Sequence, residues 1–472
     1  MDKLIKNTSL YTLGYIIPKA AQFILLPVYS RYLTPEEYGI VQLMMVLSTI
    51  LAILFSTGID RSIYRLYFDQ KTEKNKKDYL GTVTITIFIS ASLFLIIILV
   101  ANPLISKIFN LVPFFPYYLY SILTVYFTVF GLVPNIYYQV TQQAGNFILI
   151  SLLNFIISTS LVLYFVAFIG KGAEGWLLGE LVKSILFLPI YIYLIIKITN
   201  FTFIKKLAVE SISYSWPLVP TLLSAWILNL SDRIFIVHYV TLKDAGLYSI
   251  SYKLAEGLLL LSAGFNQAYS PLFFKLANQD NQIEAKKKLF RYNKIYTTAL
   301  IMGAFFISLF AKEFIFLLDA SYKSAYELVP LINMGILFSL LSNLIGLQYK
   351  QSKRTKISMS IALFTAIINI GLNFVFVPNY GAYGAAIATT ISFVFIFIVN
   401  YHFSKKCYFI PFAWKDILPL FLILFIISAL FSNIVLSFKL TVFLKIFILS
   451  ILLVYMVTKH KNVILILINK GM

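Results

Sequence analysis

The residues of this chain that could do chemistry are ionisable side chains inside long apolar segments. An ionisable group at the centre of a bilayer costs about 2.5–3.5 kcal/mol, so such groups face a protein interior or a water-filled cavity, where they pair or bind charged ligands. The candidates for a ligand-binding cavity, two tryptophans included, are Lys19, Arg31, Asp60, Arg61, Glu180, Lys183, Trp216, Trp226, Asp232, Arg233, Lys253 and Glu256.

Spacing separates some of these charges into pairs. Glu180 and Lys183 are three residues apart, as are Lys253 and Glu256, so each pair lies on one helix face, where its two charges can neutralise each other. Lys19 has no acidic residue near it on the same segment and is too deep to reach the headgroups easily. We therefore expect Lys19 to be a cation of a water-filled cavity.

Two other pairs of charges, Asp232 with Arg233 and Asp60 with Arg61, are adjacent in the sequence. Asp232 and Arg233 point about 100° apart around a helix, so the two side chains need different partners. Asp60 and Arg61 lie near the cytoplasmic end of their expected segment. Arg61 and Arg31 could instead extend to the lipid headgroups, and this is the favoured account of Arg31.

The elements that position these residues are expected to be membrane-spanning helices. Only 39 lysines and arginines and 19 acidic residues occur among 472 residues, and the mean hydropathy is +0.85, which excludes a soluble enzyme and a disordered chain. Apolar runs of at least 18 residues predict an all-α membrane protein of about fourteen spans. Their expected ranges are 10–32, 39–63, 80–101, 117–138, 147–169, 175–196, 214–240, 247–274, 295–317, 327–349, 357–377, 383–403, 417–436 and 440–458.

The basic residues are distributed very unevenly between the two sides of these spans. Loops and tails on the N-terminal side hold 26 lysines and arginines against 5 in the opposite loops, which predicts cytoplasmic termini. This asymmetry accounts for the formal charge of +20 and argues against a nucleic-acid partner. One cysteine and three scattered histidines argue against a disulfide framework or a metal site. No phosphate-loop motif is present, and no cofactor is expected.

Two short segments recur at nearly the same offset. Residues 32–39 (YLTPEEYG) align with 239–246 (YVTLKDAG), and residues 172–175 (GAEG) align with 381–384 (GAYG). The copies are six expected helices apart and have the same topology, which predicts two pseudo-symmetric six-helix lobes. The expected domains are residues 1–197, residues 198–404, and residues 405–472, which hold helices 13 and 14 and a cytoplasmic tail.

The chain resembles a known family in three stretches. They are residues 9–39 (SLYTLGYIIPKAAQFILLPVYSRYLTPEEYG), the SDR of 231–233 with DAGLYSISYKLA at 244–255, and NFVFVPNYGAYGAAIATTIS at 373–392. Together they look like the oligosaccharide flippases of the Wzx type. Those flippases belong to the multidrug/oligosaccharidyl-lipid/polysaccharide exporter superfamily, which also holds multidrug extrusion antiporters and lipid II flippases.

The resemblance implies a MATE-like, non-enzymatic transporter in the plasma (inner) membrane of a bacterium. Its substrate would be a polyprenyl-pyrophosphate-linked oligosaccharide for surface polysaccharide such as the O-antigen of lipopolysaccharide. It would contact membrane lipid and use a coupling ion (proton, sodium or chloride), with a polysaccharide polymerase and a chain-length regulator as partners. Lysine or arginine in a cavity can compensate a pyrophosphate, and Trp216 and Trp226 could stack on sugars or face lipid. The alternatives are a cation-coupled multidrug antiporter and an integral-membrane polysaccharide polymerase.

Overall fold

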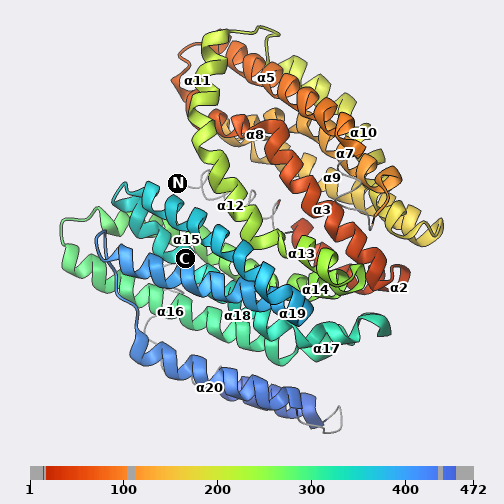
Figure 1. The fold of residues 1–472 in the computed structure, drawn as a ribbon. Coiled ribbons are helices and arrows are strands. Elements are labelled where there is room, and N and C mark those ends of the chain that lie inside the picture. The colour runs from red at the N-terminus through yellow and green to blue at the C-terminus, as the bar shows by residue number, and fades with distance from the viewer. Residues whose placement is uncertain (1–13, 15–16, 104–111, 434–439, 453–472) are drawn as a thin grey trace. The chain divides into compact units, whose positions relative to one another are not determined.

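The computed structural model describes residues 14, 17–103, 112–433 and 440–452, and within these residues it contains helices and no strand (Figure 1). The all-α prediction is therefore confirmed. Short 3-10 and π turns, labelled η, continue or separate several helices. The bounds are α2 Leu26–Tyr32, α3 Pro35–Ser56, η1 Ile59–Ser62, α4 Ile63–Leu66, η2 Tyr67–Asp69, α5 Glu73–Val100, η3 Phe114–Tyr118, α7 Leu119–Thr128, η4 Val129–Gly131, α8 Leu132–Val140, α9 Ala144–Leu163, η5 Tyr164–Phe168, α10 Gly172–Ile198, α11 Lys205–Ser215, η6 Trp216–Leu218, α12 Val219–Leu230, α13 Asp232–Tyr239, α14 Leu242–Ala255, α15 Gly257–Ala277, α16 Gln282–Leu309, α17 Ala311–Ile315, η7 Ala320–Glu327, α18 Val329–Gln351, α19 Thr355–Ser404 and α20 Trp414–Asn433.

Seven helical segments of the described chain are long and apolar enough to cross a membrane. The longest, Lys356–Ser404, covers two expected spans, 357–377 and 383–403, and breaks between them at Gly381, where φ is +58°. Residues 417–427 and 440–452 are shorter apolar helices within the expected spans 13 and 14. The beginning of the first expected span, the end of the last and both termini lie outside the described residues, and the total of fourteen remains a prediction.

The expected seventh and eighth spans are interrupted helices. The seventh breaks at the 3-10 turn Trp216–Leu218, which contains Pro217, and Pro220 follows in the first turn of α12. Proline lacks the N–H that the helix interior uses, so it favours a break or a first turn such as this one. The eighth span breaks at Glu256, between α14 and α15.

Packing divides the chain into two compact units. The first comprises residues 1–250, 318–322 and 362–392, and the second comprises residues 251–317, 323–361 and 393–472. The lobe boundaries expected at residues 197 and 404 remain a prediction.

In the first unit, α10 packs against α7 and α9, and α3 packs against α5 and α7 (Figure 1). The apolar faces of α5 and α9 are mostly exposed. Large exposed apolar surfaces of this kind are normal only where lipid or a partner covers them, as expected of helices at a membrane-facing edge.

The first repeated segment forms the same helix start twice. Thr34 caps α3: its hydroxyl accepts the Glu37 N–H at 3.2 Å, and the Glu37 carboxylate accepts the Thr34 N–H at 2.8 Å. Thr241 does the same before α14, where its hydroxyl accepts the Asp244 N–H at 3.0 Å. The recurring threonine and acidic residue are thus capping residues, which satisfy N–H groups that the helix leaves unpaired.

The glycines of the same repeat bring these two helix starts into direct contact. A Cβ on Gly39 would lie 2.0 Å from the carbonyl oxygen of Leu242, and a Cβ on Gly246 would lie 1.9 Å from the carbonyl oxygen of Pro35. The contact is reciprocal, as expected for two copies of one motif. We call it the glycine crossing (Gly39, Gly246, Pro35 and Leu242).

The second repeated segment is also reproduced in the backbone. Gly172 and Gly381 have φ values of +53° and +58°, a region that glycine enters without a steric penalty. Three residues later, Gly175 and Gly384 each pack against a backbone carbonyl, of Phe165 and Phe376 respectively. Both copies therefore make the same turn between consecutive helices.

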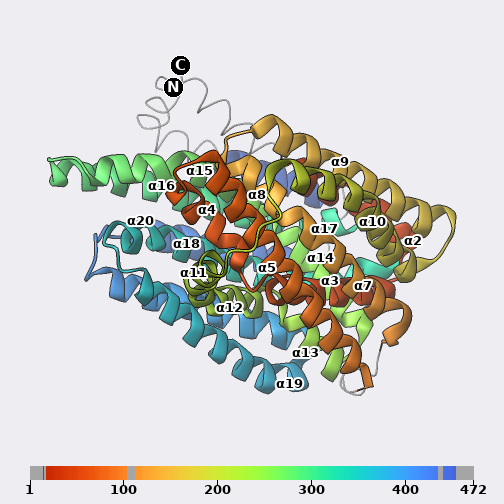
Figure 2. The same cartoon turned by 90° about the horizontal axis from the view of Figure 1, so that it is seen from above.

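In the second unit, α16 is the central helix. It packs against α15, α18 and α20, and Figure 2 shows α15, α16, α18 and α20 on the same side of that view. The side chains of α18 are mostly buried along its apolar stretch.

Candidate functional site

The first unit contains a cavity of about 600 Å³. Its walls come from residues 18–22 and from α3, α7, α8, α9 and α10. The described lining residues are Pro18, Gln22, Met45, Ser48, Thr49, Ala52, Ser121, Thr124, Val125, Thr128, Val129, Leu132, Ser151, Asn154, Phe155, Ser158, Trp176, Leu177, Glu180 and Lys183. Eleven of these twenty residues are polar, which is unusual for the interior of apolar helices, although most of the accessible wall surface is apolar.

Helical spacing explains how these polar groups converge. Ser121, Thr124 and Thr128 are positions i, i+3 and i+7 of one helix and form a single stripe. On α9, Ser151, Asn154 and Ser158 repeat the same spacing. Both stripes face the cavity. The sequence analysis did not identify them.

The charged part of the wall is one ion pair on α10. The Lys183 ammonium lies 2.7 Å from a carboxylate oxygen of Glu180, whose other oxygen accepts a hydrogen bond from Ser158. The sequence prediction that these two charges pair along the helix is confirmed. The pair lies in the cavity wall, so it can contact a ligand as well as neutralise itself.

A second polar cluster surrounds Asp232, which is fully buried in the first unit. One carboxylate oxygen accepts hydrogen bonds from Tyr248 at 2.6 Å and from Thr389 at 2.8 Å, and the other accepts one from Asn373 at 3.2 Å. Asn373 also donates to the side-chain oxygen of Asn369 at 3.2 Å. Asp232 was a sequence candidate but its partners were not: Tyr248 lies 16 residues further along the chain, and Asn373 and Thr389 lie 141 and 157 residues further.

Arg233 has a partner of its own, Asn229, and shares another, Tyr248, with Asp232. Its guanidinium donates to the carbonyl of Asn229 at 2.6 Å and lies 5.1 Å from the centre of the Tyr248 ring. Tyr248 therefore contacts both charges, the carboxylate through its hydroxyl and the guanidinium through its ring. Arg233 is also buried.

This cluster can hold a proton or a small cation. The carboxylate, the Tyr248 and Thr389 hydroxyls and the buried side-chain oxygen of Asn373 are all hard oxygen donors. The Asn373 oxygen has no hydrogen-bond partner among the described residues. No group of three or more His, Cys, Asp or Glu residues in the described chain could form a metal centre.

A family model described as "Polysaccharide biosynthesis protein" matches residues 4–277, which is more than half of the chain. The chain belongs to this family. A second model, described as MatE, matches residues 217–375.

Two curated relatives match most of the chain. The chain is 22% identical over 415 residues to the uncharacterized membrane protein MJ1375 of Methanocaldococcus jannaschii, covering 84% of this chain and 97% of the relative. The uncharacterized membrane protein MJ1068 of the same organism is 21% identical over 448 residues, covering 86% of this chain and 84% of the relative.

Solved structures show which fold this polysaccharide biosynthesis family member has. The lipid II flippase MurJ in an inward closed conformation matches with a TM-score of 0.74 at 18% identity, over 96% of this chain and 99% of MurJ. An inward-facing multidrug resistance MATE family transporter matches with a TM-score of 0.58 at 14% identity, over 86% and 94%. A MOP superfamily transporter from Pyrococcus furiosus matches with a TM-score of 0.54 at 15% identity, over 86% of this chain and 95% of that transporter. The MATE-like two-lobe fold is thus confirmed.

The candidate residues near the N-terminus lie in different surroundings. Pro18 and Gln22 line the cavity, whereas Lys19 between them is exposed. Arg31 is exposed in the last turn of α2. The role of Lys19 as a cavity cation remains a prediction.

Two further candidate pairs are ion pairs in the structure. Asp60 is buried and lies 3.4 Å from the Arg61 guanidinium, which is half exposed. In the second unit, Lys253 lies 3.1 Å from Glu256. The structure therefore confirms the pairing expected for residues 253 and 256.

The two tryptophans differ in their contacts. Trp216 is exposed in η6. Trp226 on α12 donates from its indole nitrogen to the Val46 carbonyl of α3 at 3.0 Å. This hydrogen bond gives Trp226 a packing role. Stacking of either residue on sugars remains a prediction.

A buried ion pair of the second unit was missed by the sequence analysis. Lys445, on the helix of residues 440–452, lies 2.8 and 2.9 Å from the two carboxylate oxygens of Glu313 on α17. Lys445 is 3% exposed. The available signal was that each charge lies in an apolar span without a partner on its own helix, which requires a partner on another helix.

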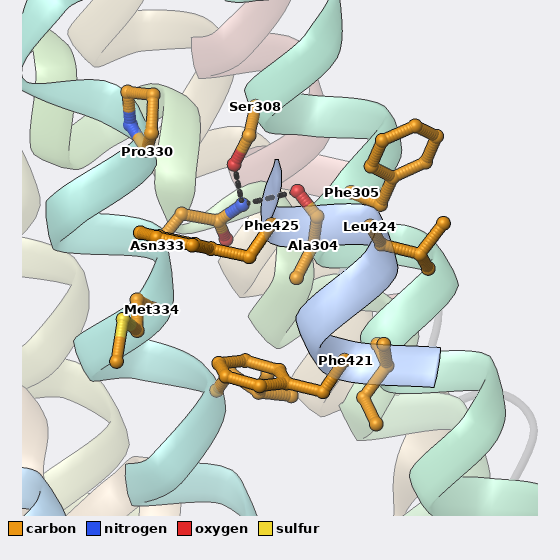
Figure 3. Close-up of a pocket in the computed structure, with 11 residues that line it drawn as sticks. Ala304, Phe305, Ser308, Pro330, Asn333, Met334, Phe421, Leu424 and Phe425 are labelled. Atoms are coloured by element: carbon orange, nitrogen blue, oxygen red, sulfur yellow. Dashed lines mark hydrogen bonds between the residues drawn. The ribbon is translucent and has the colours of Figure 1, made fainter. Parts of the chain in front are cut away.

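The second unit also has a small, mainly apolar cavity of about 40 Å³ between α16, α18 and α20 (Figure 3). Figure 3 shows Asn333 pointing toward α16, where it donates to the Ala304 carbonyl at 2.5 Å and to Ser308 at 2.9 Å. Phe421 and Phe425 of α20 close the other side. This volume admits water rather than a large ligand.

Proposed function

We propose that this protein is a flippase that moves a polyprenyl-pyrophosphate-linked oligosaccharide from the cytoplasmic to the outer leaflet of the plasma membrane. The observation that carries the proposal is the polar cavity of the first unit. Sugars are dense in hydroxyl groups, and a wall of serine, threonine and asparagine side chains with one neutralised ion pair provides hydrogen bonds for them. Membership of a polysaccharide biosynthesis family supports the same class of substrate.

Transport would proceed by alternating access. The glycine crossing joins the starts of α3 and α14, which the charge asymmetry of the loops assigns to the outer side of the membrane. A crossing without side chains between the backbones permits a tight closure there. The closure must loosen when the substrate leaves, so the two glycines would be part of an outer gate.

The buried Asp232 cluster would bind the coupling ion. A carboxylate with three neutral hydrogen-bond donors and a buried arginine nearby can bind and release a proton or a sodium ion. Ion binding there would change the packing among α13, α14 and α19, which carry the cluster. This links the ion to the helix that starts at the glycine crossing.

The second candidate function is a cation-coupled multidrug antiporter, which the MatE match to residues 217–375 favours. Such an antiporter attracts organic cations with an unpaired carboxylate. The acidic residue of the cavity wall, Glu180, is paired with Lys183 at 2.7 Å. We therefore favour the flippase.

Deletion of the gene in its host tests the proposal. The expected result is accumulation of lipid-linked oligosaccharide in the plasma membrane with loss of surface glycan, both restored by the intact gene. Normal amounts of both, together with greater sensitivity to cationic dyes, would instead support the antiporter. The same strains can be used to ask whether a polysaccharide polymerase and a chain-length regulator copurify with the protein.

A further inference from the structure

We propose that the cavity of the first unit is a glycan subsite selective for sugars rich in hydrogen-bond donors, and that it disfavours acidic sugars and the pyrophosphate. The inference rests on the proposed function and specifies which part of the substrate this cavity takes. The selectivity follows from the hydrogen bonds of the wall: most hydroxyl hydrogens are donated to protein groups, and the oxygen lone pairs stay available to a ligand.

The threonine and serine hydroxyls of the wall mostly donate to their own helices. Thr49 donates to the Met45 carbonyl at 2.9 Å and Ser121 to the Tyr117 carbonyl at 2.9 Å. These hydroxyls have one hydrogen and two lone pairs each. With the hydrogen engaged, they offer a ligand acceptors only.

The other threonines of the α7 stripe make the same kind of bond. Thr124 donates to the Tyr120 carbonyl and Thr128 to the Thr124 carbonyl, both at 2.7 Å. On the facing helix, Ser158 donates to Glu180. Five hydroxyls of the described wall therefore present lone pairs to the cavity.

The amide and the carboxylate of the wall add further acceptors. The two N–H groups of Asn154 are directed to the Ile150 carbonyl at 3.1 Å and to the Tyr191 hydroxyl at 2.9 Å, which leaves the side-chain oxygen for a ligand. The Glu180 carboxylate contributes oxygens as well, and the Lys183 ammonium that could attract an anion is held by it at 2.7 Å.

Ser48, Ser151 and Gln22 also line the cavity and can donate to a ligand, but the acceptors described above outnumber them, so a ligand that uses most of this wall brings hydrogen-bond donors. Sugar hydroxyls and the N–H of amino or acetamido groups are donors, whereas a uronate or a pyrophosphate offers only acceptors and negative charge. A uronate or a pyrophosphate would face these acceptor oxygens. The Lys183 ammonium would do little to offset its negative charge, because Glu180 already neutralises that ammonium. Aromatic surface for the apolar faces of sugars comes from Phe155 and from Trp176, whose ring centre lies 4.5 Å from that of Tyr29.

Flipping in proteoliposomes of three fluorescent lipids tests the inference. One is a polyprenyl pyrophosphate with a neutral N-acetylated disaccharide, the second has a uronic acid in place of one sugar, and the third has no sugar. The test variant is Thr128→Val and the matched control is Thr86→Val, because Thr86 on α5 makes the same bond to its own helix, to the Thr82 carbonyl at 2.7 Å, away from the cavity. Thr124→Val serves if Thr128→Val does not fold.

The inference expects the wild type to move the neutral glycan lipid faster than the acidic one. In Thr128→Val the rate ratio of neutral glycan lipid to bare lipid should fall about fivefold, as expected for one neutral hydrogen bond of about 1 kcal/mol, and it should stay unchanged in Thr86→Val. Equal ratios in both variants, or faster flipping of the acidic lipid, would overturn the glycan subsite and leave the flippase intact. A wild type that moves none of the three lipids would overturn both.

Discussion

Replacing Gly39 with alanine tests the packing of the glycine crossing. The new Cβ would lie 2.0 Å from the carbonyl oxygen of Leu242, where ordinary contact begins at 3.4 Å, so the two helix starts must separate by roughly 1.4 Å. Overpacking of a well-packed site costs about 1–3 kcal/mol. We expect a cost near 3 kcal/mol because the new Cβ meets a backbone carbonyl, which cannot move aside as a side chain can. This cost corresponds to about a 150-fold shift in the population of the closed arrangement.

The assay is thermal unfolding of the purified protein in detergent, with flipping measured on the same preparation. Gly371→Ala is the matched control, since the added Cβ has nothing within 4 Å and alanine is favoured over glycine inside a helix. Gly39→Ala should lower Tm and Gly371→Ala should not. If Gly39→Ala unfolds at the same temperature as the control, the crossing is not tight and its role as a gate is wrong.

The mirror variant gives an internal check. Gly246→Ala would place its Cβ 1.9 Å from the carbonyl oxygen of Pro35, so its loss of stability should be similar. The double variant separates the same two backbones only once, and its loss should therefore be smaller than the sum of the two single losses. Strict additivity would show that the two glycines make independent contacts.

Three further variants test other parts of the account. Asp232→Asn should lower ion-driven flipping at least tenfold while protein yield is retained. The rate is measured in proteoliposomes with an imposed ion gradient, and an unchanged rate would exclude this residue as the ion site. Glu313→Ala should destabilise the protein by about 3–5 kcal/mol because Lys445 is left buried without its counter-charge. The exchanged pair, Glu313→Lys with Lys445→Glu, should recover part of this loss. Equal Tm values for the wild type, the single variant and the exchanged pair would contradict the assignment. Lys19→Ala should abolish surface polysaccharide without loss of protein, and normal polysaccharide would end its assignment as a cavity cation.

Features set by neighbouring residues could be predicted from the sequence. The ion pairs of residues 180 and 183 and of residues 253 and 256 follow from a three-residue spacing on a helix. The recurring threonine and acidic residue at positions 34 and 37 and at 241 and 244 proved to be caps, which are also local. The break of the seventh span at Pro217 likewise depends on the chemistry of one residue.

Features that depend on packing could not be predicted in this way. Two of the three partners of Asp232 lie 141 and 157 residues further along the chain, at Asn373 and Thr389, and nothing in the local sequence specifies them. The mutual contact of Gly39 and Gly246 also follows from tertiary packing. The repeat in the sequence indicated equivalent positions, but not that the two copies meet.

The cavity is an intermediate case. Its polar stripes on α7 and α9 have the i, i+3 and i+7 spacing that a search of apolar spans for serine, threonine and asparagine would find. A criterion of charge alone identifies only Glu180 and Lys183 among these wall residues. Whether the two stripes face one another depends on how the helices pack, and that required the structure.

Flipping by the purified protein in liposomes tests the central claim most directly. A fluorescent polyprenyl-pyrophosphate-linked oligosaccharide is placed in both leaflets, and its movement is followed with a membrane-impermeant quencher under an imposed sodium or proton gradient. A parallel sample contains a fluorescent organic cation. We predict movement of the oligosaccharide lipid that Asp232→Asn abolishes, and no export of the cation. Gradient-driven export of the cation with an immobile oligosaccharide lipid would contradict the account.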